Sequence, residues 1–249
     1  MSPSSIGSSD EAAFKAEHQL KEAPSPGKGQ WIDLGGTRAY LALPEGAKAP
    51  LPAIVVIHEW WGLNRNIELW SDRIAAEGWA ALAVDLYGGK VAKTSDEAMA
   101  DMKTVDDAAA AKVIDRAYDF LANDPRVHAR KRAVIGWCFG GGWSLQTALA
   151  HPDLDGAIIY YGMLDPDPAH LAAIHGRVLG IFGNKDGHIT PGDVDAFERG
   201  LASAHVKAEI HRYDAPHAFA NPSNPAYDET SAADAWEHVK AFLHALSST

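Results

Sequence analysis

The feature that most constrains the fold is a regular alternation of short apolar segments with longer segments of helical periodicity, beginning at residue 31. Residues 53–57, AIVVI, form a continuous apolar run that is typical of a strand buried on both faces of a sheet. Between such runs, apolar residues recur at helical spacing. This alternation predicts βαβ units, which build an α/β fold with a mostly parallel central sheet and helices on both faces.

The same patterns place the individual elements along the chain. Gly35 and Gly36 separate the first two strand segments and suggest a hairpin, and Gly78 ends a helix. We expect strands at residues 31–34, 39–43, 53–57, 79–84, 132–135, 157–160, 178–182 and 209–213. We expect helices at residues 66–77, 105–121, 141–150 and 191–202, followed by a C-terminal helix striped by Trp236, Val239, Leu243 and Leu246.

The chain divides into a polar start and one large domain. Residues 1–30 are polar, with a short helical segment at residues 11–21 before a stretch rich in proline and glycine. We interpret them as a tail or an arm packed on the domain surface. No second linker follows, so residues 31–249 are expected to form a single domain.

Charge and hydropathy exclude several classes of function. The formal net charge is -11 and no basic block is present, which argues against a nucleic-acid partner. No apolar run reaches the length of a membrane span, and the N-terminus lacks the features of a signal peptide. We expect a soluble, cytoplasmic protein, with export after removal of a signal peptide as the alternative. A single cysteine cannot form an intrachain disulfide.

Four chemically reactive residues directly follow expected strands. Glu59 follows the strand at 53–57, Cys138 the strand at 132–135, Asp186 the strand at 178–182, and His217 the strand at 209–213. In open parallel sheets, ligands bind beyond the carboxyl ends of the strands. These four side chains should therefore meet along one edge of the sheet.

Cys138 stands at the centre of Gly136-Trp137-Cys138-Phe139-Gly140, which has the form of a nucleophile elbow with cysteine in place of serine. The sharp turn from strand to helix strains the nucleophile, and side chains at the two glycine positions would collide with the turn. The helix N-terminus favours a thiolate. Two other readings of the motif are a small buried cysteine and a phosphate-binding loop.

A thiol nucleophile needs a base, and the base needs a group that orients it. The order Cys138, Asp186, His217 is the nucleophile, acid, histidine order of an α/β-hydrolase triad. Taken singly, His217 could be a surface histidine and Asp186 a turn residue, but their joint placement favours catalysis. We assign the oxyanion donors to the backbone N–H groups of Phe139 and Trp60.

Glu59 lies in His58-Glu59-Trp60-Trp61-Gly62, beside the expected oxyanion donor. A carboxylate near the thiol would compete with His217 for the thiol proton, and could keep Cys138 neutral until substrate arrives. The alternative is a structural ion pair of Glu59 with an arginine. The functional interpretation is the one that we favour.

With these residues in place, the chain resembles the dienelactone hydrolase (carboxymethylenebutenolidase) family of α/β-hydrolases. The segments that carry the resemblance are VIHEWWGLN (56–64), AVDLYGGKVA (83–92), IGWCFGGGW (135–143), FGNKDGHITP (182–191) and HRYDAPHAFANPSNPAY (211–227). The resemblance implies lactone hydrolysis by Cys138, with His217 as base, Asp186 as its orienter and no metal or organic cofactor. It also implies that Glu59 helps to switch the cysteine to a thiolate when substrate binds.

The chain departs from the family at two positions that would bind a substrate carboxylate. One expected arginine follows Asp-Leu-Tyr, where this chain has Gly88, Gly89 and then Lys90; the other falls at Asn221. Lys90 could substitute for the first arginine, and Asn221 is itself a candidate substrate-binding residue. Aromatic residues that could line an apolar pocket, although core packing is the alternative for about half of them, are Trp60, Trp61, Tyr87, Trp143, Tyr161 and Phe219.

We therefore expect a hydrolase that cleaves a lactone or carboxylic ester through a Cys-His-Asp triad and a thioester acyl-enzyme. One alternative is a broad carboxylesterase for neutral or aromatic esters without dienelactone activity. Another is a non-catalytic protein that senses or binds through its thiol on the same fold. The expected partner is a small-molecule ester or lactone, and the protein is expected to be a monomer or a homodimer.

Overall fold

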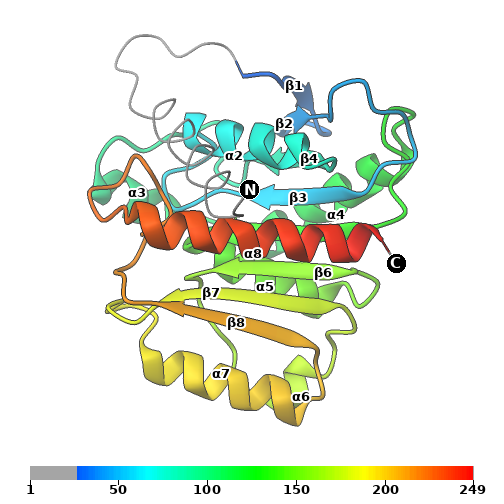
Figure 1. Cartoon of the computed structure of the whole chain (residues 1–249). Coiled ribbons are helices and arrows are strands. Elements are labelled where there is room, and N and C mark those ends of the chain that lie inside the picture. The colour runs from blue at the N-terminus through cyan, green and yellow to red at the C-terminus, as the bar shows by residue number, and fades with distance from the viewer. Residues whose placement is uncertain (1–26, 249) are drawn as a thin grey trace, which may run out of the picture.

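A computed structural model of the chain describes residues 27–248 and places eight strands in one sheet (Figure 1). The strand order is β1-β2-β4-β3-β5-β6-β7-β8. The β1–β2 and β2–β4 pairs are antiparallel, and all other neighbouring strands run parallel. The strands are β1 Gln30–Asp33, β2 Arg38–Ala42, β3 Ala53–Ile57, β4 Ala80–Val84, β5 Arg132–Trp137, β6 Gly156–Tyr160, β7 Arg177–Gly183 and β8 Ala208–Tyr213.

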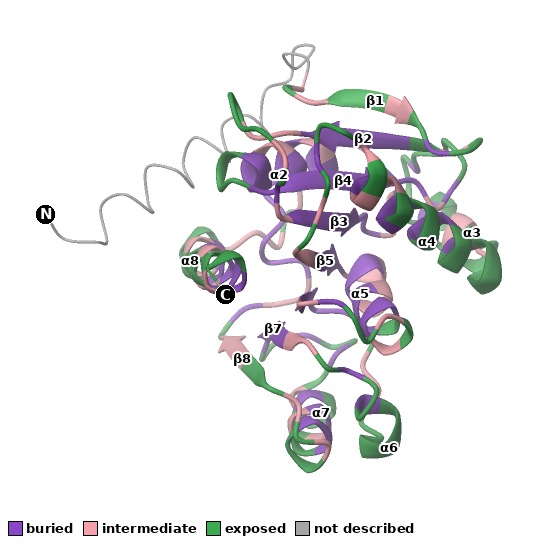
Figure 2. Ribbon diagram, turned by 90° about the vertical axis from the view of Figure 1, so that its right-hand side faces the viewer, coloured by how far each residue is buried: buried purple, intermediate pink, exposed green. Residues whose placement is uncertain are grey.

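Helices cover both faces of this sheet. Side chains of α2 and α8 pack on one face, and those of α4, α5 and α7 pack on the other. Figure 2 shows the ribbons of α8 and α5 on opposite sides of the sheet. The helices are α2 Arg65–Ala76, α3 Ser95–Lys103, α4 Asp107–Asn123, α5 Phe139–Ala150, α6 Pro168–Leu171, α7 Pro191–Ser203 and α8 Glu229–Ser247. The fold is therefore the α/β fold with a mostly parallel sheet that the sequence predicts.

The buried strands explain why the alternating pattern is readable in the sequence. Every residue of β3 is fully buried, because β4 and β5 flank it and helices cover both of its faces. Helix α2 begins after Asn64, whose side chain accepts a hydrogen bond from the Ile67 backbone N–H. Periodicity and capping signals thus agree at these elements.

Two helices are absent from the sequence prediction, and a third begins later than predicted. Helix α3 is absent from it because Ala98 is its one buried residue, so the segment has no apolar stripe. Helix α6 has four residues, too few to show a period. Helix α4 begins at Asp107, later than expected, because the side chain of Asp106 accepts a hydrogen bond from Ala109 and caps it.

The described residues include the last part of the expected N-terminal arm, from residue 27 onward. The backbone N–H groups of Lys28 and Gly29 donate to the carboxylate of Asp72 on α2, so this stretch lies on the domain surface. The helix expected at residues 11–21 lies outside the described residues. In residues 27–248, no helix combines the length and apolar character that crossing a bilayer would require.

A cluster of tryptophans supports the strand that leads into the expected site. Trp137, the last residue of β5, packs against Trp70 of α2 with ring centroids 4.8 Å apart. Trp70 in turn packs against Trp236 of α8 at 5.5 Å. Large aromatic side chains contribute much of a core's packing energy, so the end of β5 rests on a well-filled core.

Candidate active site

Cys138 lies at the sharp turn between β5 and α5 and has an unusual backbone conformation. Its φ is 55° and its ψ is -114°, a region that non-glycine residues avoid because of steric strain. A Cβ on Gly136 would overlap the backbone of Gly140, and one on Gly140 would overlap the carbonyl oxygen of Ile57. Both glycines of the expected elbow are therefore required by close backbone approach.

His217 and Asp186 form a short hydrogen bond beyond the ends of β8 and β7. The His217 Nδ1–H group donates to Asp186 Oδ2 at 2.6 Å. Burial lowers the pKa of His217, but the bond to Asp186 and the proximity of Cys138 outweigh burial and raise this pKa to about 10. The arrangement therefore stabilises a protonated imidazole next to the sulfur.

Asp186 is buried yet well supplied with donors. Burial would raise its pKa, but the hydrogen bonds from His217 and from the His188 and Ile189 backbone N–H groups lower it. The carboxylate thus remains ionised, and it fixes the proton of His217 on Nδ1. The other ring nitrogen of His217, Nε2, is left to exchange a proton with its surroundings.

Glu59 is buried beside these groups and accepts two amide hydrogen bonds. The Nδ2 groups of Asn221 and Asn66 donate to its Oε2 at 2.6 and 3.3 Å. Burial raises the pKa of Glu59 to about 7, against the opposing effects of His217 and the two amides. No arginine pairs with this carboxylate among the described residues, so the structural alternative of an ion pair is not formed.

His58 positions the loop that carries Glu59, a role that the sequence did not reveal. Its Nε2 accepts a hydrogen bond from the Leu86 backbone N–H at 3.1 Å, so the proton must be on Nδ1, which donates to the Glu59 carbonyl oxygen at 2.6 Å. Burial lowers the pKa of His58 and keeps the ring neutral. The available signal was a histidine between a buried strand and Glu59.

The residues expected to supply the oxyanion donors, Trp60 and Phe139, line one pocket together with Cys138 and His217. Among the described groups, neither backbone N–H donates a hydrogen bond to the protein. Gly62 completes the turn after Trp60, and its N–H donates to the Glu59 carbonyl oxygen at 3.2 Å.

The pocket is a cleft of about 1160 Å³ beyond the carboxyl ends of the strands. Of the aromatic side chains expected to line it, Trp60, Trp61, Trp143 and Tyr161 do so. Phe219 lies beneath, fully buried, with its ring 5.7 Å from that of Tyr161. Three methionines that no sequence pattern indicated also line the cleft, namely Met99, Met102 and Met163.

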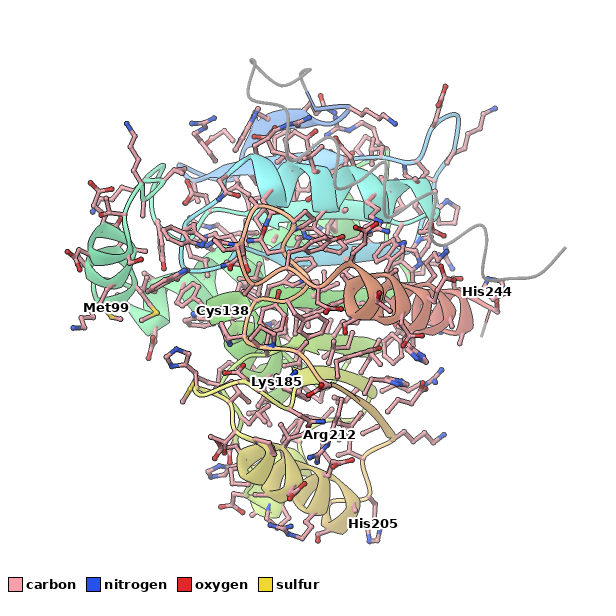
Figure 3. All side chains as sticks on the ribbon, turned by 60° about the vertical axis from the view of Figure 1, so that its left-hand side comes forward. Met99, Cys138, Lys185, His205, Arg212 and His244 are labelled. Atoms are coloured by element: carbon pink, nitrogen blue, oxygen red, sulfur yellow. The ribbon has the colours of Figure 1, made fainter. Side chains whose placement is uncertain are left out.

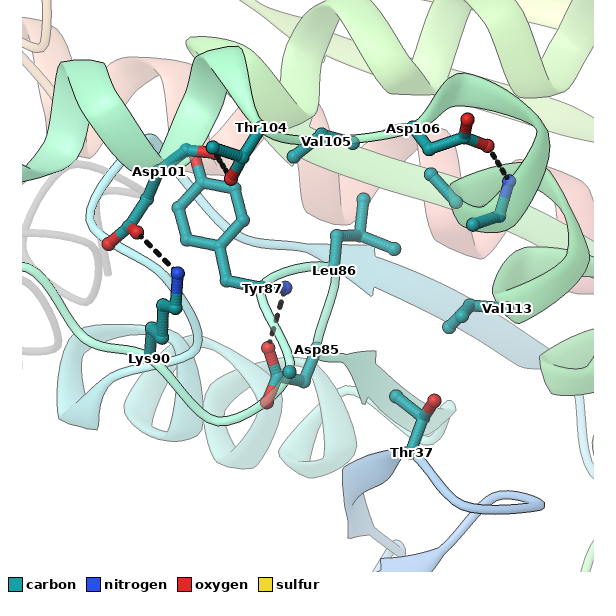
Figure 4. Close-up of a pocket in the computed structure, with 13 residues that line it drawn as sticks. Thr37, Asp85, Leu86, Tyr87, Lys90, Asp101, Thr104, Val105, Asp106 and Val113 are labelled. Atoms are coloured by element: carbon teal, nitrogen blue, oxygen red, sulfur yellow. Dashed lines mark hydrogen bonds and ion pairs between the residues drawn. The ribbon is translucent and has the colours of Figure 1, made fainter.

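Besides Phe219, three further residues expected to contact substrate lie outside the lining of this cleft. Asn221 is occupied by Glu59, and both Tyr87 and Lys90 line a smaller, separate hollow of about 300 Å³ (Figure 4). Lys90 forms an ion pair with Asp101 at 3.1 Å, and the Tyr87 phenol points toward α3 and Thr104. The cause is Asp85, which accepts the Tyr87 and Gly89 backbone N–H groups and turns this loop away from the cleft.

Among the described residues, the lining of the cleft carries acidic side chains but no strongly basic ones. None of its lining residues, all within the described part of the chain, is lysine or arginine. Three carboxylates line it instead, those of Glu59, Asp107 and Asp165. No three His, Cys, Asp or Glu side chains of residues 27–248 are grouped in a way that could hold a metal ion.

Together the parallel sheet, the strained turn after β5 and the histidine–aspartate pair after β7 and β8 define an α/β-hydrolase. The model of the dienelactone hydrolase family matches residues 37–247. The chain belongs to the dienelactone hydrolase family, and it is a hydrolase that acts on ester bonds. The resemblance that the sequence motifs indicate is thereby confirmed.

Individual relatives agree with this assignment. A Saccharolobus solfataricus protein to which carboxymethylenebutenolidase activity is ascribed is 34% identical over 255 residues, covering 84% of this chain and 94% of its own. An Escherichia coli protein with the same ascribed activity is 31% identical, covering 81% and 79%.

Solved structures match the fold over most of the chain. A Klebsiella pneumoniae protein assigned as a dienelactone hydrolase has a TM-score of 0.81 at 27% identity, with 87% of this chain and 98% of that chain covered. A dienelactone hydrolase-like promiscuous phosphotriesterase from metagenomic libraries has a TM-score of 0.77 at 26% identity, covering 88% and 97%.

Proposed function

We propose that the protein hydrolyses neutral carboxylic esters or lactones through a Cys138 thioester, with His217 as the base and Asp186 as the residue that orients it. One observation carries the proposal. Cys138 stands at φ 55° on the turn into α5, in the same cleft as the imidazole that Asp186 holds at 2.6 Å. Strain of this kind is retained where function needs an exposed nucleophile.

In the first half of the reaction, His217 takes the thiol proton and the Cys138 thiolate attacks the ester carbonyl carbon. The carbonyl oxygen gains negative charge, which the Trp60 and Phe139 backbone N–H groups stabilise. Removal of one such donor costs about 3–4 kcal/mol of barrier in a well-studied hydrolase. The positive end of the α5 dipole acts in the same direction.

In the second half, the carbon–oxygen bond breaks and the alkoxide leaves with the proton from His217. In a lactone, this alcohol remains tethered to the acyl group. His217 then accepts a proton from water, which attacks the thioester, and the Cys138 thiolate leaves as the carboxylic acid forms. Proton and nucleophile are both restored, so the cycle needs no cofactor.

Glu59 controls how much negative charge the cysteine can carry before substrate binds. Its pKa of about 7 means that it changes charge near neutrality. When Glu59 is ionised, its charge repels negative charge on the Cys138 sulfur. When Glu59 is neutral, this repulsion is absent.

Charge in the cleft selects the substrate class. A lysine or arginine would be needed to compensate the carboxylate of an anionic dienelactone, and the described lining contains neither, while Asp107 and Asp165 add negative charge. This favours neutral esters and lactones, and the broad carboxylesterase among the two enzymatic alternatives. A non-catalytic thiol-binding protein would not need the Asp186–His217 pair.

The test is hydrolysis of 4-nitrophenyl acetate by the wild type, by Cys138→Ala and by Ser144→Ala. Cys138→Ala should lose at least about a thousandfold in kcat. Ser144→Ala is the matched control: its hydroxyl is buried within α5 and lacks a hydrogen-bond partner in the described structure, so activity should be retained.

Equal rates for wild type and Cys138→Ala would refute the assignment of the nucleophile. Alkylation of Cys138 without turnover of any ester would support the thiol-binding alternative. A panel of neutral esters, neutral lactones, phosphotriesters and an anionic dienelactone should rank the neutral carboxylic substrates first. A preference for the anionic dienelactone would contradict the charge argument.

A further inference from the structure

The cleft at Cys138 continues along the whole length of α5. One face of that helix carries Phe139, Trp143, Gln146 and Ala150, which are spaced by one or two helical turns, and all four line the cleft. At 1.5 Å per residue, the twelve residues of α5 give a groove about 18 Å long. This is far longer than a small lactone ring requires.

Apolar side chains from other elements form the opposite walls. Met99 and Met102 come from α3, Ala111 from α4, and Met163 and Leu164 from the segment after β6. Met99 is 39% exposed and Met163 71% exposed, two of four large hydrophobic side chains that the described surface leaves open. Figure 3 shows Met99 at the outer edge of the molecule, on the same side as Cys138.

The reaction geometry decides which part of the substrate occupies the groove. The leaving alcohol must face His217, because it takes a proton from that ring. His188 and Ala218 line the cleft on this side, the ring of His188 lying 5.4 Å from that of His217. The acyl group lies on the other side of the attacked carbon, toward the groove along α5.

The charge of the groove restricts the far end of the acyl group. Asp107, Gln146 and Asp165 are polar residues in this lining, and no lysine or arginine among the described residues accompanies them. A carboxylate at the chain terminus would lie near Asp107 without a partner, which is unfavourable in a partly desolvated groove. A neutral methyl terminus has no such cost.

We propose that the groove along α5 binds the extended acyl chain of a neutral, fatty-acyl-type ester, with room for about twelve carbons. The proposal deepens the proposed function, because it requires the ester carbonyl to be seated at Cys138. Flexible methionine side chains suit such a chain, since they adapt to an apolar partner of variable shape. The contribution per methylene group should be about twofold in kcat/KM, as the groove is open on one side.

The direct test is a series of 4-nitrophenyl esters with acyl chains from acetate to dodecanoate, kept below their aggregation limits. For the wild type, kcat/KM should rise with chain length. Ala150→Trp would fill the far end of the groove and should lower the ratio of kcat/KM for dodecanoate to kcat/KM for acetate at least about tenfold. Ala108→Trp is the matched control, because Ala108 is exposed on α4 and lines neither cavity.

A second readout does not depend on ester turnover. Cys138 is the one thiol of the chain, so N-alkylmaleimides of increasing chain length label it alone, and intact mass gives the rate. The labelling rate should rise with alkyl length in the wild type and in Ala108→Trp. In Ala150→Trp, the rise should stop at shorter chains.

The outcomes separate the two proposals. A length-dependent labelling rate without any ester hydrolysis would reject the proposed function and retain the groove as an acyl-binding site. Ester hydrolysis that falls steadily from acetate upward, with identical profiles in Ala150→Trp and wild type, would reject the groove and retain the esterase. Flat labelling rates would likewise overturn the groove assignment.

Discussion

At the scale of single residues, Glu59 has the strongest influence on the chemistry that we propose for Cys138. Its carboxyl group is buried and held by Asn221 and Asn66, and burial raises its pKa to about 7. It also interacts electrostatically with His217. The charge of Glu59 therefore changes near neutral pH, and the ionised carboxylate opposes negative charge on the Cys138 sulfur.

The charge of Glu59 should weaken the pH dependence of alkylation at Cys138. As pH rises through the pKa of Glu59, about 7, the carboxylate becomes negative beside the sulfur, so the rate of alkylation by iodoacetamide should rise less steeply than that of an isolated thiol. In Glu59→Gln, whose side chain stays neutral, the steeper rise should return. The measurement is the alkylation rate by intact mass at several pH values.

Asp119→Asn is the control for this experiment, because it removes the same charge from an exposed position on α4. It should behave as the wild type does. Alkylation rates that rise equally steeply with pH in the wild type and in Glu59→Gln would show that Glu59 does not influence the reactivity of Cys138.

Sequence patterns located the reactive residues better than the residues around them. The positions of Asp186 and His217 were predictable because each follows a strand of a parallel sheet. Asn221 was predicted to contact substrate, yet it binds Glu59, 162 positions away in the chain. Such a contact depends on how a loop folds back in three dimensions, which neither periodicity nor spacing encodes.

At the scale of elements, the turn from β5 into α5 is the part of the fold with the least steric freedom. Gly140 packs against the backbone at the end of β3, and Gly136 packs against Gly140. The sheet therefore holds the N-terminus of α5 directly against the loop of Glu59. Close packing at this point fixes Cys138 in its strained conformation.

Gly140→Ala should destabilise the protein by about 3 kcal/mol or more, because the new methyl group would overlap the Ile57 and His58 carbonyl oxygens. Gly192→Ala provides a matched control in the first turn of α7, where the added methyl meets nothing closer than 3.7 Å. It should be neutral or stabilising by up to about 1 kcal/mol. Denaturant unfolding measures both; equal stabilities would contradict the packing argument.

Burial of a repeated apolar pattern is what made β3 and α8 predictable from the sequence. Strand β3 is an uninterrupted apolar segment, and α8 carries a stripe of buried residues at helical spacing. Helix α3 has one buried residue and was missed, although it contributes Met99 and Met102 to the wall of the cleft. A helix that serves the site more than the core leaves little trace in the hydrophobic pattern.

At the scale of the whole molecule, net charge and cleft composition act together. The formal net charge is -11, and the lining of the cleft has carboxylates but no lysine or arginine among the described residues. Long-range repulsion would slow the approach of an anionic ester, and the cleft would not compensate its charge on arrival. The composition of the chain indicated the long-range repulsion. The lack of a compensating charge in the cleft depends on the loop of Asp85, which turns Lys90 away from the cleft.

The proposed function depends on a thioester that forms on Cys138 during turnover. The most direct measurement is intact mass and peptide mapping of enzyme quenched in acid while it hydrolyses a 4-nitrophenyl ester. We predict a mass increase of one acyl group, located on Cys138, in wild type and absent from Cys138→Ala. An acyl group on any other residue during turnover, or continued turnover by Cys138→Ala, would show that Cys138 is not the nucleophile.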